Sequence, residues 1–543
     1  MSASPTTSPH SPAVLLAVLI GVALLAIAAR VIPQPRTIDD AFITFRYSRN
    51  IVEGEGFVYN PGARTLGTTT PFYTVWMAAI SFVSGSESYP WFALITSSLA
   101  DAATVILLGL LAYRLTRHLL PAALIGILWA LSPMSVTFAI GGMETSVVIL
   151  WLVAAAYCYV TGHERGMAVF AALGVLTRID TLIWVGPLLL HQLITHWRQT
   201  RADGRTLAAL PRRVPWQSWA IFAVILLPWY VFSWRYFGSL LSNSLQAKQV
   251  AYHIEDFHAL VRLLQHIATP FMEAKALGVP GIVIGLALYP ALAASGTLYA
   301  VKRAPRLLPF LLYPWLYIAV FGLMNPLIFR WYLAPLLAPY FLAILLGVWG
   351  LGTSVLAALD RTRALPRVVA ALGIVWIALS LNAWTLRPDH GPDRPAPKMA
   401  WHQIELYYRQ MAEQLRREYG VNEETLLAAG DIGAIGFYSR ARILDTVGLV
   451  TPELSRYYPL PAERYEDGQN YIVPPPIIFD YDPDYIVFME MFLRHGLADE
   501  PDFTTQYAQV DRIPTDFYGT GMLLYQRRDL ARTGARPAIL VPR

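Results

Sequence analysis

Long apolar runs separated by short polar segments dominate the first 385 residues of the chain. A helix that crosses a bilayer needs roughly 17–25 predominantly apolar residues. Eleven runs follow this pattern, although two of them are short for a bilayer, above all 166–178. The runs lie near residues 13–32, 90–113, 120–140, 145–161, 166–178, 181–197, 216–237, 279–301, 307–325, 331–351 and 368–385. The pattern predicts a mainly α-helical, multispanning bundle of about eleven transmembrane helices.

The distribution of basic residues predicts the orientation of these helices. With the N-terminus inside the cell, five short cytoplasmic loops together carry 14 Lys and Arg residues. The two long loops on the opposite side, 33–89 and 238–278, carry only four and three. Short basic loops stay on the cytoplasmic side, so we expect a cytoplasmic N-terminus and an extracytoplasmic C-terminus. The first run, 13–32, is too long and unbroken for a signal-peptide core, so we expect it to be retained.

Residues 71–84 are apolar as well, but they are expected to behave differently. Counting them as a span would move the loop at Arg114 and most other basic loops to the outside, against the rule for basic loops. We therefore expect an interfacial or re-entrant helix here. It would lie within a first extracytoplasmic loop that covers residues 33–89.

The pattern changes after the last apolar run. Residues 386–400 are expected to be a Pro-rich linker between a transmembrane domain, 1–385, and a soluble extracytoplasmic α/β domain, 401–543. Apolar residues at helical spacing from Trp401 to Leu415 predict a helix that stops at Gly420. The stretches TLLAAG, ARILDTV, DYIVFM and GMLLYQ predict strands around this helix.

Composition supports the membrane assignment and excludes other classes of protein. The chain is 55% hydrophobic and only 15% charged, whereas soluble domains carry about 25% charged residues. The net charge of +5 arises from short loops between spans, so we expect no nucleic-acid partner. The only cysteine, Cys158, lies in an apolar run, which excludes a disulfide framework and a cysteine-based metal site.

Motifs of several soluble enzymes are absent or incomplete. The stretch GDIGAIGF spaces Gly430, Gly433 and Gly436 evenly but lacks G-x-G, so we expect its glycines to make turns rather than a dinucleotide site. FDYDPDY starts like a calcium loop but lacks the glycine at position six and the acid at position twelve. No P-loop, H-E-x-x-H or G-x-S-x-G motif occurs, which argues against an ATPase, a zinc protease and a serine hydrolase.

The stretch TIDDAFITFRYSRN, residues 37–50, carries two adjacent acids directly after the first apolar run. Carboxylates beside hydrocarbon are costly, so Asp39 and Asp40 are functional candidates. A structural alternative is a capping box, in which Thr37 and Asp40 cap a helix and Asp39 complements its dipole. Capping accounts well for one acid and poorly for the second. It leaves Asp39 freer, with a pKa held low by the helix start.

Several blocks of the sequence together resemble a known family. They are DDAFITFRYSRNIVEGEGFVYNPGARTLGTTTPFYTVW, GGMETSVV, LTRIDTLIW, LLSNSLQAKQ, FRWYLAPLLAP and AAGDIGAIGFYSRARILDTVGLV. In this order they resemble the multispanning GT-C glycosyltransferases that use polyprenyl-phosphate sugars, in the branch of the mycobacterial terminal arabinofuranosyltransferases. The chain departs from that branch at Ile179, where relatives commonly have proline, and near Ser244, where the tyrosine of an N-T-x-Y block is missing.

The resemblance implies an inverting glycosyltransferase whose catalytic domain is the transmembrane region 1–385. It places the general base on Asp39, with Asp40 as a second catalytic acid or the ligand of a divalent cation, Mg or Mn. Arg46 and Tyr47 in the first block, and Glu144 beside Gly142, are candidates for substrate binding.

Four cations, Arg46, Arg178, Lys248 and Arg330, are candidates for the donor phosphate. Arg178 and Arg330 lie at the ends of spans, where snorkelling to water is the alternative explanation. Lys248 lies in an outer loop, where simple solvation is the alternative. Glu144 has an alternative role as a helix cap.

The expected partners are a polyprenyl-phosphate sugar donor, membrane lipids and a glycan, lipid or protein acceptor. The expected location is the bacterial plasma membrane, with transfer of the sugar to the cell envelope at the outer face. The alternatives are a polymerase or ligase of lipid-linked glycans and a flippase. A flippase would be expected to show an inverted repeat or paired broken helices, which the sequence lacks.

Overall fold

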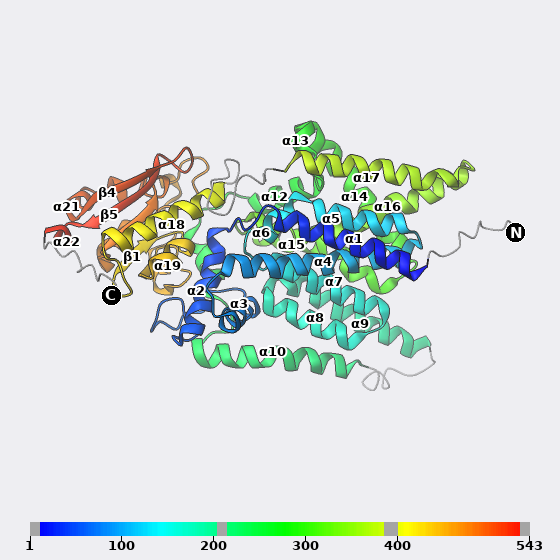
Figure 1. Ribbon diagram of the computed structural model, residues 1–543, viewed down its shortest axis with the longest axis horizontal. Helices are drawn as coiled ribbons and strands as arrows, with labels where there is room; N and C mark the ends of the chain where they lie inside the picture. Colours follow the sequence, from blue (N-terminus) through cyan, green and yellow to red (C-terminus); the bar gives the residue numbers. More distant parts are fainter. Residues whose placement is uncertain (1–10, 203–213, 385–399, 533–543) are drawn as a thin grey trace.

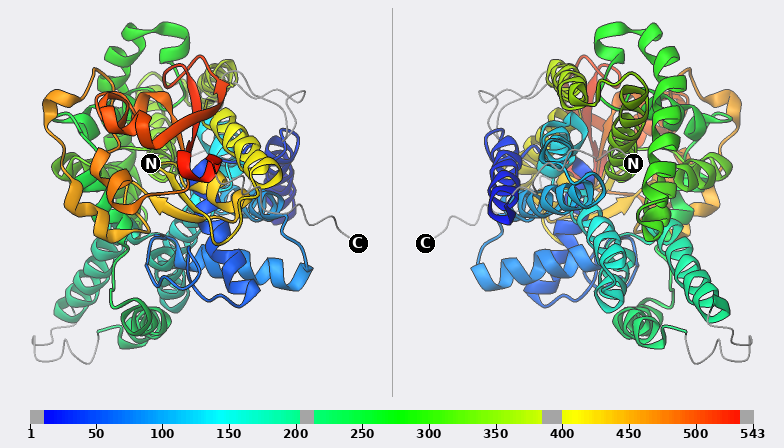
Figure 2. Two further views of the ribbon diagram at one scale, coloured as in Figure 1. Left: turned by 90° about the vertical axis from the view of Figure 1, so that its left-hand side faces the viewer. Right: turned by 90° about the vertical axis from the view of Figure 1, so that its right-hand side faces the viewer.

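A bundle of long helices carries an α/β domain at one end (Figure 1). The computed structural model describes residues 11–202, 214–384 and 400–532. The predicted linker, 386–400, falls outside the described residues except for its last position. Seen from the end that carries the α/β domain, the domain lies across the ends of the long helices (Figure 2).

Helices occupy all eleven predicted positions. The spans correspond to α1 (Pro12–Val31), α4 (Tyr89–Thr116), α5 (Leu119–Leu131) with α6 (Pro133–Ile140), α7 (Thr145–Thr161), α8 (Glu164–Thr177), α9 (Leu182–Ala202), α10 (Trp216–Phe237), α14 (Val279–Val301), α15 (Leu308–Met324), α16 (Leu337–Ala358) and α17 (Leu365–Asn382). By length and composition, seven described helical segments can cross a membrane, and the α5–α6 pair, bent by 51°, makes an eighth. Helix α7 is apolar but shorter, and α8, at 14 residues, is shorter still.

The bend between α5 and α6 has a local cause. Ser132 is extended and Pro133 begins α6. Proline cannot donate an N–H within a helix, and it disfavours helical geometry in the residue before it.

The spans expose large apolar side chains outward, as in α10, of which only 6% is buried. The chain is therefore a multi-pass membrane protein, and the predicted fold class is confirmed.

The bundle is held together in its interior by a buried ion pair. Arg30 Nε lies 2.7 Å from Asp101 Oδ2, and both side chains are fully buried. The Asp101 carboxylate also accepts hydrogen bonds from Trp129 and Ser146, at 2.9 Å each, while Arg30 donates to Ser135. An ion pair in a low dielectric stabilises only if its remaining polar atoms are satisfied. This one ties α1, α4, α5, α6 and α7 together.

Smaller elements surround the end of the bundle nearest the α/β domain. They are α2 (Asp39–Glu53), α3 (Pro71–Ser84), α11 (Asn243–Ala251), α12 (His258–Ala268) and α13 (Ala274–Leu277). Helix α3 occupies the position at which an interfacial or re-entrant helix is predicted. The predicted first outer loop therefore forms two packed helices joined by a shaped loop.

The C-terminal domain is a five-stranded mixed sheet with the strand order β2-β1-β3-β5-β4. Its elements are α18 (Ala400–Glu418), β1 (Leu426–Ala429), α19 (Gly433–Ser439), β2 (Arg442–Asp445), α20 (Pro475–Tyr481), β3 (Tyr485–Met489), α21 (Pro501–Gln506), β4 (Tyr507–Pro514), β5 (Gly521–Arg527) and α22 (Arg528–Arg532). The four predicted strands and the predicted helix are present. Sequence reasoning missed β4, a half-exposed edge strand whose polar residues and bulge between Gln509 and Asp511 hide the alternation.

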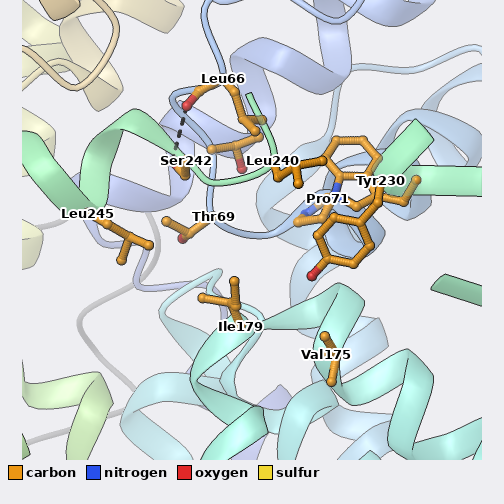
Figure 3. Close-up of a pocket in the computed structure, with 11 residues that line it drawn as sticks. Leu66, Thr69, Pro71, Val175, Ile179, Tyr230, Leu240, Ser242 and Leu245 are labelled. Carbon is orange, nitrogen blue, oxygen red and sulfur yellow. Dashed lines mark hydrogen bonds between the residues drawn. The ribbon is translucent and has the colours of Figure 1, made fainter. Parts of the chain in front are cut away.

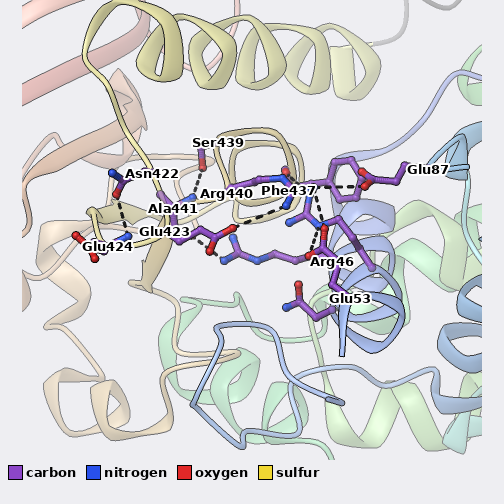
Figure 4. Close-up of polar contacts among 12 residues, drawn as sticks. Arg46, Glu53, Glu87, Asn422, Glu423, Glu424, Phe437, Ser439, Arg440 and Ala441 are labelled. Carbon is purple, nitrogen blue, oxygen red and sulfur yellow. Dashed lines mark hydrogen bonds and ion pairs between the residues drawn. The ribbon is translucent and has the colours of Figure 1, made fainter. Parts of the chain in front are cut away.

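Arg440 links the domain to the bundle through carboxylates of both parts. It lies 2.9 Å from Glu53 at the end of α2, 3.3 Å from Glu87 before α4 and 3.8 Å from Glu423 of the domain itself (Figure 4). These groups are partly exposed, so each pair contributes little on its own. Their arrangement nevertheless fixes α19 against α2, which brings the predicted acidic pair to the domain boundary.

Candidate active site

Asp39 and Asp40 form the first turn of α2 at the boundary between bundle and domain. The N-cap residue is Ile38, and no side chain caps the helix. The capping-box expectation for Thr37 and Asp40 is therefore wrong. It failed because α2 begins two residues after Thr37, so that Asp40 lies inside the first turn.

Asp39 is bound to the C-terminal domain. Its side chain is buried, with the residue only 8% exposed. Its Oδ2 accepts a hydrogen bond of 2.9 Å from the Gly433 amide, and its Oδ1 accepts one of 2.7 Å from the Ala434 amide. Both carboxylate oxygens of Asp39 thus accept hydrogen bonds from backbone amides in the first turn of α19. The expectation that Asp39 is the freer of the two acids is wrong.

Two glycines of the GDIGAIGF stretch make this contact sterically feasible. A Cβ atom at Gly433 would collide with the Asp39 carbonyl, and one at Gly436 would collide with the Tyr59 hydroxyl. Neither glycine has a positive φ. The expectation that these glycines make turns is therefore wrong, because what they provide is a close approach of α19 to α2.

A third acid, Asp431, joins the pair. Tyr408 donates a hydrogen bond of 3.0 Å to Asp431 Oδ2. Burial and the charge of Asp40 raise the pKa of Asp431 to about 6. Burial, Asp431 and Asp40 raise the pKa of Asp39 well above its ordinary value, despite the two backbone N–H bonds. The predicted low pKa of Asp39 is thus wrong, because burial beside other acids outweighs the helix start.

Asp40 has the accessible carboxylate of the pair. Its side chain is 30% exposed, and its Oδ2 lies 3.6 Å from Lys248 Nζ, on α11. Burial lowers the pKa of Lys248, but the charges of Asp40 and Tyr332 raise it by more than burial lowers it. The pKa of Lys248 is therefore raised overall. The lysine therefore keeps its charge in a half-buried position. The sequence-predicted Asp40 and Lys248 are brought together.

Residues 329–332 contain or contact three of the four predicted phosphate-binding cations. Lys248 Nζ lies 4.4 Å above the Phe329 ring, and the Arg178 guanidinium lies 4.8 Å above the Tyr332 ring. These two rings contact each other, with centroids 5.9 Å apart. Arg330 lies apart from them, over the Trp401 ring at 5.1 Å. Cation–π contact holds each cation in place without neutralising it.

Arg178 is already paired with two acids. Its guanidinium contacts Glu144 at 2.8 Å and Asp180 at 2.7 Å. Glu144 is buried and precedes α7 without making a side-chain cap bond. The cap alternative for Glu144 is therefore wrong. Glu144 holds Arg178 instead, and the charge of Arg178 acts on Lys248.

Arg46 and Tyr47 have structural roles that exclude phosphate binding in this conformation. Arg46 is 1% exposed and donates to the carbonyls of Tyr59, Gly436 and Ala441. The Tyr47 hydroxyl donates to the Thr65 carbonyl and accepts from the Gly67 amide. The expectation that these residues bind substrate is corrected: Arg46 joins α2 to the C-terminal domain (Figure 4), and Tyr47 joins α2 to residues 65 and 67 of the first loop.

A small apolar cavity of about 30 Å³ adjoins this group (Figure 3). Val175 and Ile179 lie on one side of it, Tyr230 of α10 on another, and Leu66 and Ser242 above. Ile179 directly follows Arg178 in the chain. A second cavity of about 520 Å³ shares Leu66, Ser242 and Leu245 with the first and also has polar residues such as Arg64 in its lining. The two cavities therefore meet at these three shared residues.

The divalent cation expected at Asp40 stays a prediction. Among the described residues, no group of three or more His, Cys, Asp or Glu side chains is placed to hold a metal ion. Lys248 already lies 3.6 Å from one oxygen of Asp40. The donors around Asp40 alone do not fit a closed metal site.

Sequence reasoning missed Asp431 and the aromatic supports Phe329 and Tyr332. Asp431 lies within the GDIGAIGF stretch, where the glycine spacing could have indicated close packing against another element. Phe329 and Tyr332 lie within the FRWYLAPLLAP block, but nothing in their spacing identifies which ring supports which cation.

Comparisons with known proteins agree on the architecture. Residues 397–533 match a family described as a domain of unknown function, DUF8728. No curated protein sequence matches the chain. ArnT from Cupriavidus metallidurans, in a crystal structure bound to undecaprenyl phosphate, is 14% identical, with a TM-score of 0.54 over 95% of this chain and 98% of ArnT.

Two further structures resemble the chain. The apo crystal structure of the same ArnT gives a TM-score of 0.55 at 14% identity, over 96% of this chain and 99% of ArnT. The mycobacterial arabinofuranosyltransferase AftD gives 0.38 at 15% identity, over 96% of this chain but only 40% of AftD. At that score, the likeness to AftD carries no argument. The likeness to ArnT shows the fold, which is of the GT-C type.

Proposed function

We propose that the protein is an inverting glycosyltransferase that moves a sugar from a polyprenyl-phosphate donor to a cell-envelope glycan, lipid or protein. The observation that carries the proposal is the contact of Asp40 with Lys248, a proton acceptor beside a phosphate-binding cation, at the boundary between bundle and domain. The GT-C-type fold and the undecaprenyl phosphate bound to ArnT support it.

The donor would bind with its lipid between helices and its phosphate at the cations. The cavity between Val175, Ile179 and Tyr230 is apolar and adjoins the residue after Arg178. A prenyl chain entering beside α10 would therefore carry its phosphate toward Arg178 and Lys248. Arg178 is fixed by two acids, so Lys248 is the cation that can exchange its partner.

The transfer step follows from this exchange. When the donor phosphate takes Lys248 as its counter-ion, the Asp40 carboxylate loses the nearby positive charge and becomes a better proton acceptor. It takes the proton of the acceptor hydroxyl as that oxygen forms a bond to the anomeric carbon. The bond from this carbon to the phosphate oxygen breaks, and its electron pair leaves with the lipid phosphate. Attack opposite the leaving group inverts the anomeric centre.

Asp39 would act as a positioning residue. Its carboxylate bridges α2 and α19 and so sets the place of Asp40. A general base contributes roughly 10²–10⁴ to a rate, and its benefit depends on geometry held to a fraction of an ångström. Transfer would occur at the outer face of the bacterial plasma membrane, with the C-terminal domain outside, as the basic loops indicate.

Transfer of radiolabel tests the proposal. The purified full-length chain, in lipid nanodiscs, is given decaprenyl- or undecaprenyl-phosphate carrying a labelled pentose or hexose, together with delipidated envelope glycan. We expect the label to move to the glycan, with release of free lipid phosphate and inversion at the anomeric carbon. Movement of intact donor across a liposome without transfer would identify a flippase. Polymerisation of lipid-linked glycan without use of the monosaccharide donors would identify a polymerase.

A further inference from the structure

The larger cavity, of about 520 Å³, lies where a lipid-facing helix leaves the membrane. Its lining includes Phe237, the last residue of α10, together with Leu241 and Leu245 further along the chain. Trp234, about one turn before the end of α10, is 62% exposed. Exposed tryptophan is typical of the boundary between hydrocarbon and lipid headgroups. The cavity therefore lies at headgroup depth, on the side of the C-terminal domain.

Three leucines present apolar side chains to the surroundings at this depth. Leu240 is 47% exposed, Leu241 54% and Leu245 42%. Leu241 and Leu245 line the larger cavity, while Leu240 and Leu245 line the smaller apolar cavity beside it (Figure 3). Exposed apolar side chains cost free energy against water but not against acyl chains. An occupant with an apolar tail is thus favoured over a free, water-soluble ligand.

The interior of the cavity offers one cation and several neutral polar groups. Arg64 lies over the Tyr236 ring at 4.7 Å and, within the described residues, makes no ion pair. Gln246 and Gln249, three positions apart on α11, are exposed, and their side chains make no hydrogen bond to the described part of the chain. None of the described residues that line the cavity carries a carboxylate. An anion at Arg64 would therefore meet no acid in the cavity.

The start of α11 fixes the shape of the cavity. Asn243 Nδ2 donates hydrogen bonds of 2.5 and 3.1 Å to the carbonyls of Gly448 and Leu449, in the C-terminal domain. Ser242 Oγ donates one of 3.1 Å to the Leu66 carbonyl. The first loop, α11 and the domain are thereby joined around the cavity. A site whose walls are already fixed binds its ligand with less loss of entropy than a mobile one.

The cavity is separate from the candidate reactive group. Lys248 lies on the same helix as the two glutamines but is not part of the lining. Its Nζ contacts Asp40 and the Phe329 ring instead. A ligand in the cavity would therefore pack against the helix that carries Lys248 without reaching the reacting atoms.

We propose that this cavity binds the headgroup of an anionic membrane phospholipid that carries hydroxyl groups, such as phosphatidylglycerol. The lipid phosphate takes Arg64 as its counter-ion, and the headgroup hydroxyls bond to the amides of Gln246 and Gln249. The acyl chains lie along Leu241 and Leu245 toward α10. A choline or ethanolamine headgroup fits poorly, because the cavity offers its ammonium group no carboxylate. The proposal does not depend on the proposed transferase activity.

Native mass spectrometry tests the role of Arg64. The delipidated full-length protein in detergent is titrated with dioleoyl phosphatidylglycerol or dioleoyl phosphatidylcholine. We expect one phosphatidylglycerol to bind more tightly than any further copy and more tightly than phosphatidylcholine. Arg64→Gln should weaken this binding about tenfold. Arg235→Gln, which removes an exposed cation of α10 outside the lining of the cavity, is the matched control and should bind normally.

A third lipid tests the two glutamines. Phosphatidylethanol has the charge of phosphatidylglycerol but no headgroup hydroxyl. Hydrogen bonds to two hydroxyls should make phosphatidylglycerol bind about fivefold more tightly than phosphatidylethanol. The double variant Gln246→Leu/Gln249→Leu should bind both lipids equally. A difference that persists in this variant would overturn the assignment of the hydroxyl contacts.

The outcomes separate this site from general attraction of lipids and from the donor site. Loss of tight binding in Arg64→Gln, at an unchanged melting temperature and with normal binding in Arg235→Gln, supports the site even if no transferase activity is found. Equal loss in both arginine variants, or equally tight binding of phosphatidylcholine, would overturn it. Displacement of the phosphatidylglycerol by equimolar undecaprenyl phosphate would also overturn it, because the cavity would then belong to the donor.

Discussion

Lys248 Nζ lies 3.6 Å from the Asp40 carboxylate, so a candidate phosphate ligand is the counter-ion of the candidate base. The two residues come from α11 and α2, which lie in different loops between the long helices of the bundle. Each is also held on a second side, Lys248 over the Phe329 ring and Asp40 by its place in the first turn of α2. Under the proposed function, binding of the donor phosphate to Lys248 would therefore compete with this ion pair.

Replacing Lys248 by glutamine should weaken donor binding. The donor phosphate would lose its exchangeable cation, and we expect the dissociation constant for a polyprenyl phosphate to rise about tenfold or more, which corresponds to about 1.4 kcal/mol. Titration of fluorescent polyprenyl phosphate measures this change. The matched control, Lys275→Gln, changes an exposed lysine of the same long loop and should bind the donor normally. Equal loss of folded protein in Lys248→Gln would instead indicate a structural lysine.

The raised pKa of Asp431 predicts how stability depends on pH. Its pKa is raised to about 6 in the folded protein, so between about pH 4 and pH 6 the folded state binds a proton that the unfolded state has released. The free energy of unfolding should therefore fall as pH rises through this window and level off above it. Thermal melts of the detergent-solubilised protein from pH 4 to pH 8 measure the trend.

Asp431→Asn should remove the Asp431 part of that dependence. The amide keeps an oxygen that can accept from Tyr408 but carries no charge beside Asp39 and Asp40. At pH 7 we expect a higher melting temperature than in the parent, with a gain on the order of 2 kcal/mol from relieved burial and repulsion. A melting temperature that falls equally at every pH would show that Asp431 stabilises the domain in its charged form.

The sequence predicted the membrane bundle because apolar runs and basic loops are local signals. It also predicted four of the five strands and the helix that contains Tyr408, because their apolar spacing is regular. Asp40 and Lys248 were named separately, as an acid of the first loop and as a phosphate candidate, and only the structure shows that they lie 3.6 Å apart. The fold could thus be predicted largely from the sequence, whereas the site could be predicted only in part.

The errors concern contacts between segments that lie far apart in the chain. Nothing near Asp39 indicates that the amides of Gly433 and Ala434 bind it, some 394 and 395 positions away. Arg46 was predicted to bind phosphate because its actual partners could not be recognised in the sequence. These partners are backbone carbonyls, which every residue carries. The pKa of Asp39 was misjudged for the same reason, since burial depends on the docked domain.

Gly433→Ala should disturb the docking of the C-terminal domain. The added Cβ would meet the Asp39 backbone carbonyl, which is part of a helix and cannot move aside easily. We expect faster limited proteolysis near residues 385–399 and a lower melting temperature, as overpacking typically costs about 1–3 kcal/mol. Gly186→Ala, in α9 with open space around it, is the control and should be neutral or slightly stabilising. Unchanged proteolysis in Gly433→Ala would mean that the contact is not tight in solution.

Topology reporters test the orientation on which the outer-face site depends. A reporter fused after residue 390 should be active only outside the cytoplasm, and one fused at residue 205 only inside, because the basic loops are expected to be cytoplasmic. The reverse result at either position would place the acidic group on the cytoplasmic side. The donor would then have to be presented there, and the proposed acceptor in the cell envelope would be excluded.

The two acids of α2 should respond differently to the same substitution. Asp40→Asn keeps the shape of a partly exposed side chain but cannot take a proton, so turnover should fall by about 10² or more while the melting temperature barely changes. Donor affinity should not fall, because Lys248 loses the carboxylate that competes with the donor phosphate. Asp39→Asn has one oxygen for two backbone donors, and its NH₂ group would face a donor amide of α19. Leaving a buried donor unsatisfied costs about 1–3 kcal/mol, so we expect a lower melting temperature and a weakened domain contact. Steady-state kinetics and thermal melts on both variants separate these roles. A loss of turnover in Asp39→Asn at normal stability, with near-normal turnover in Asp40→Asn, would move the base to Asp39 and require its carboxylate to leave α19 when the donor binds.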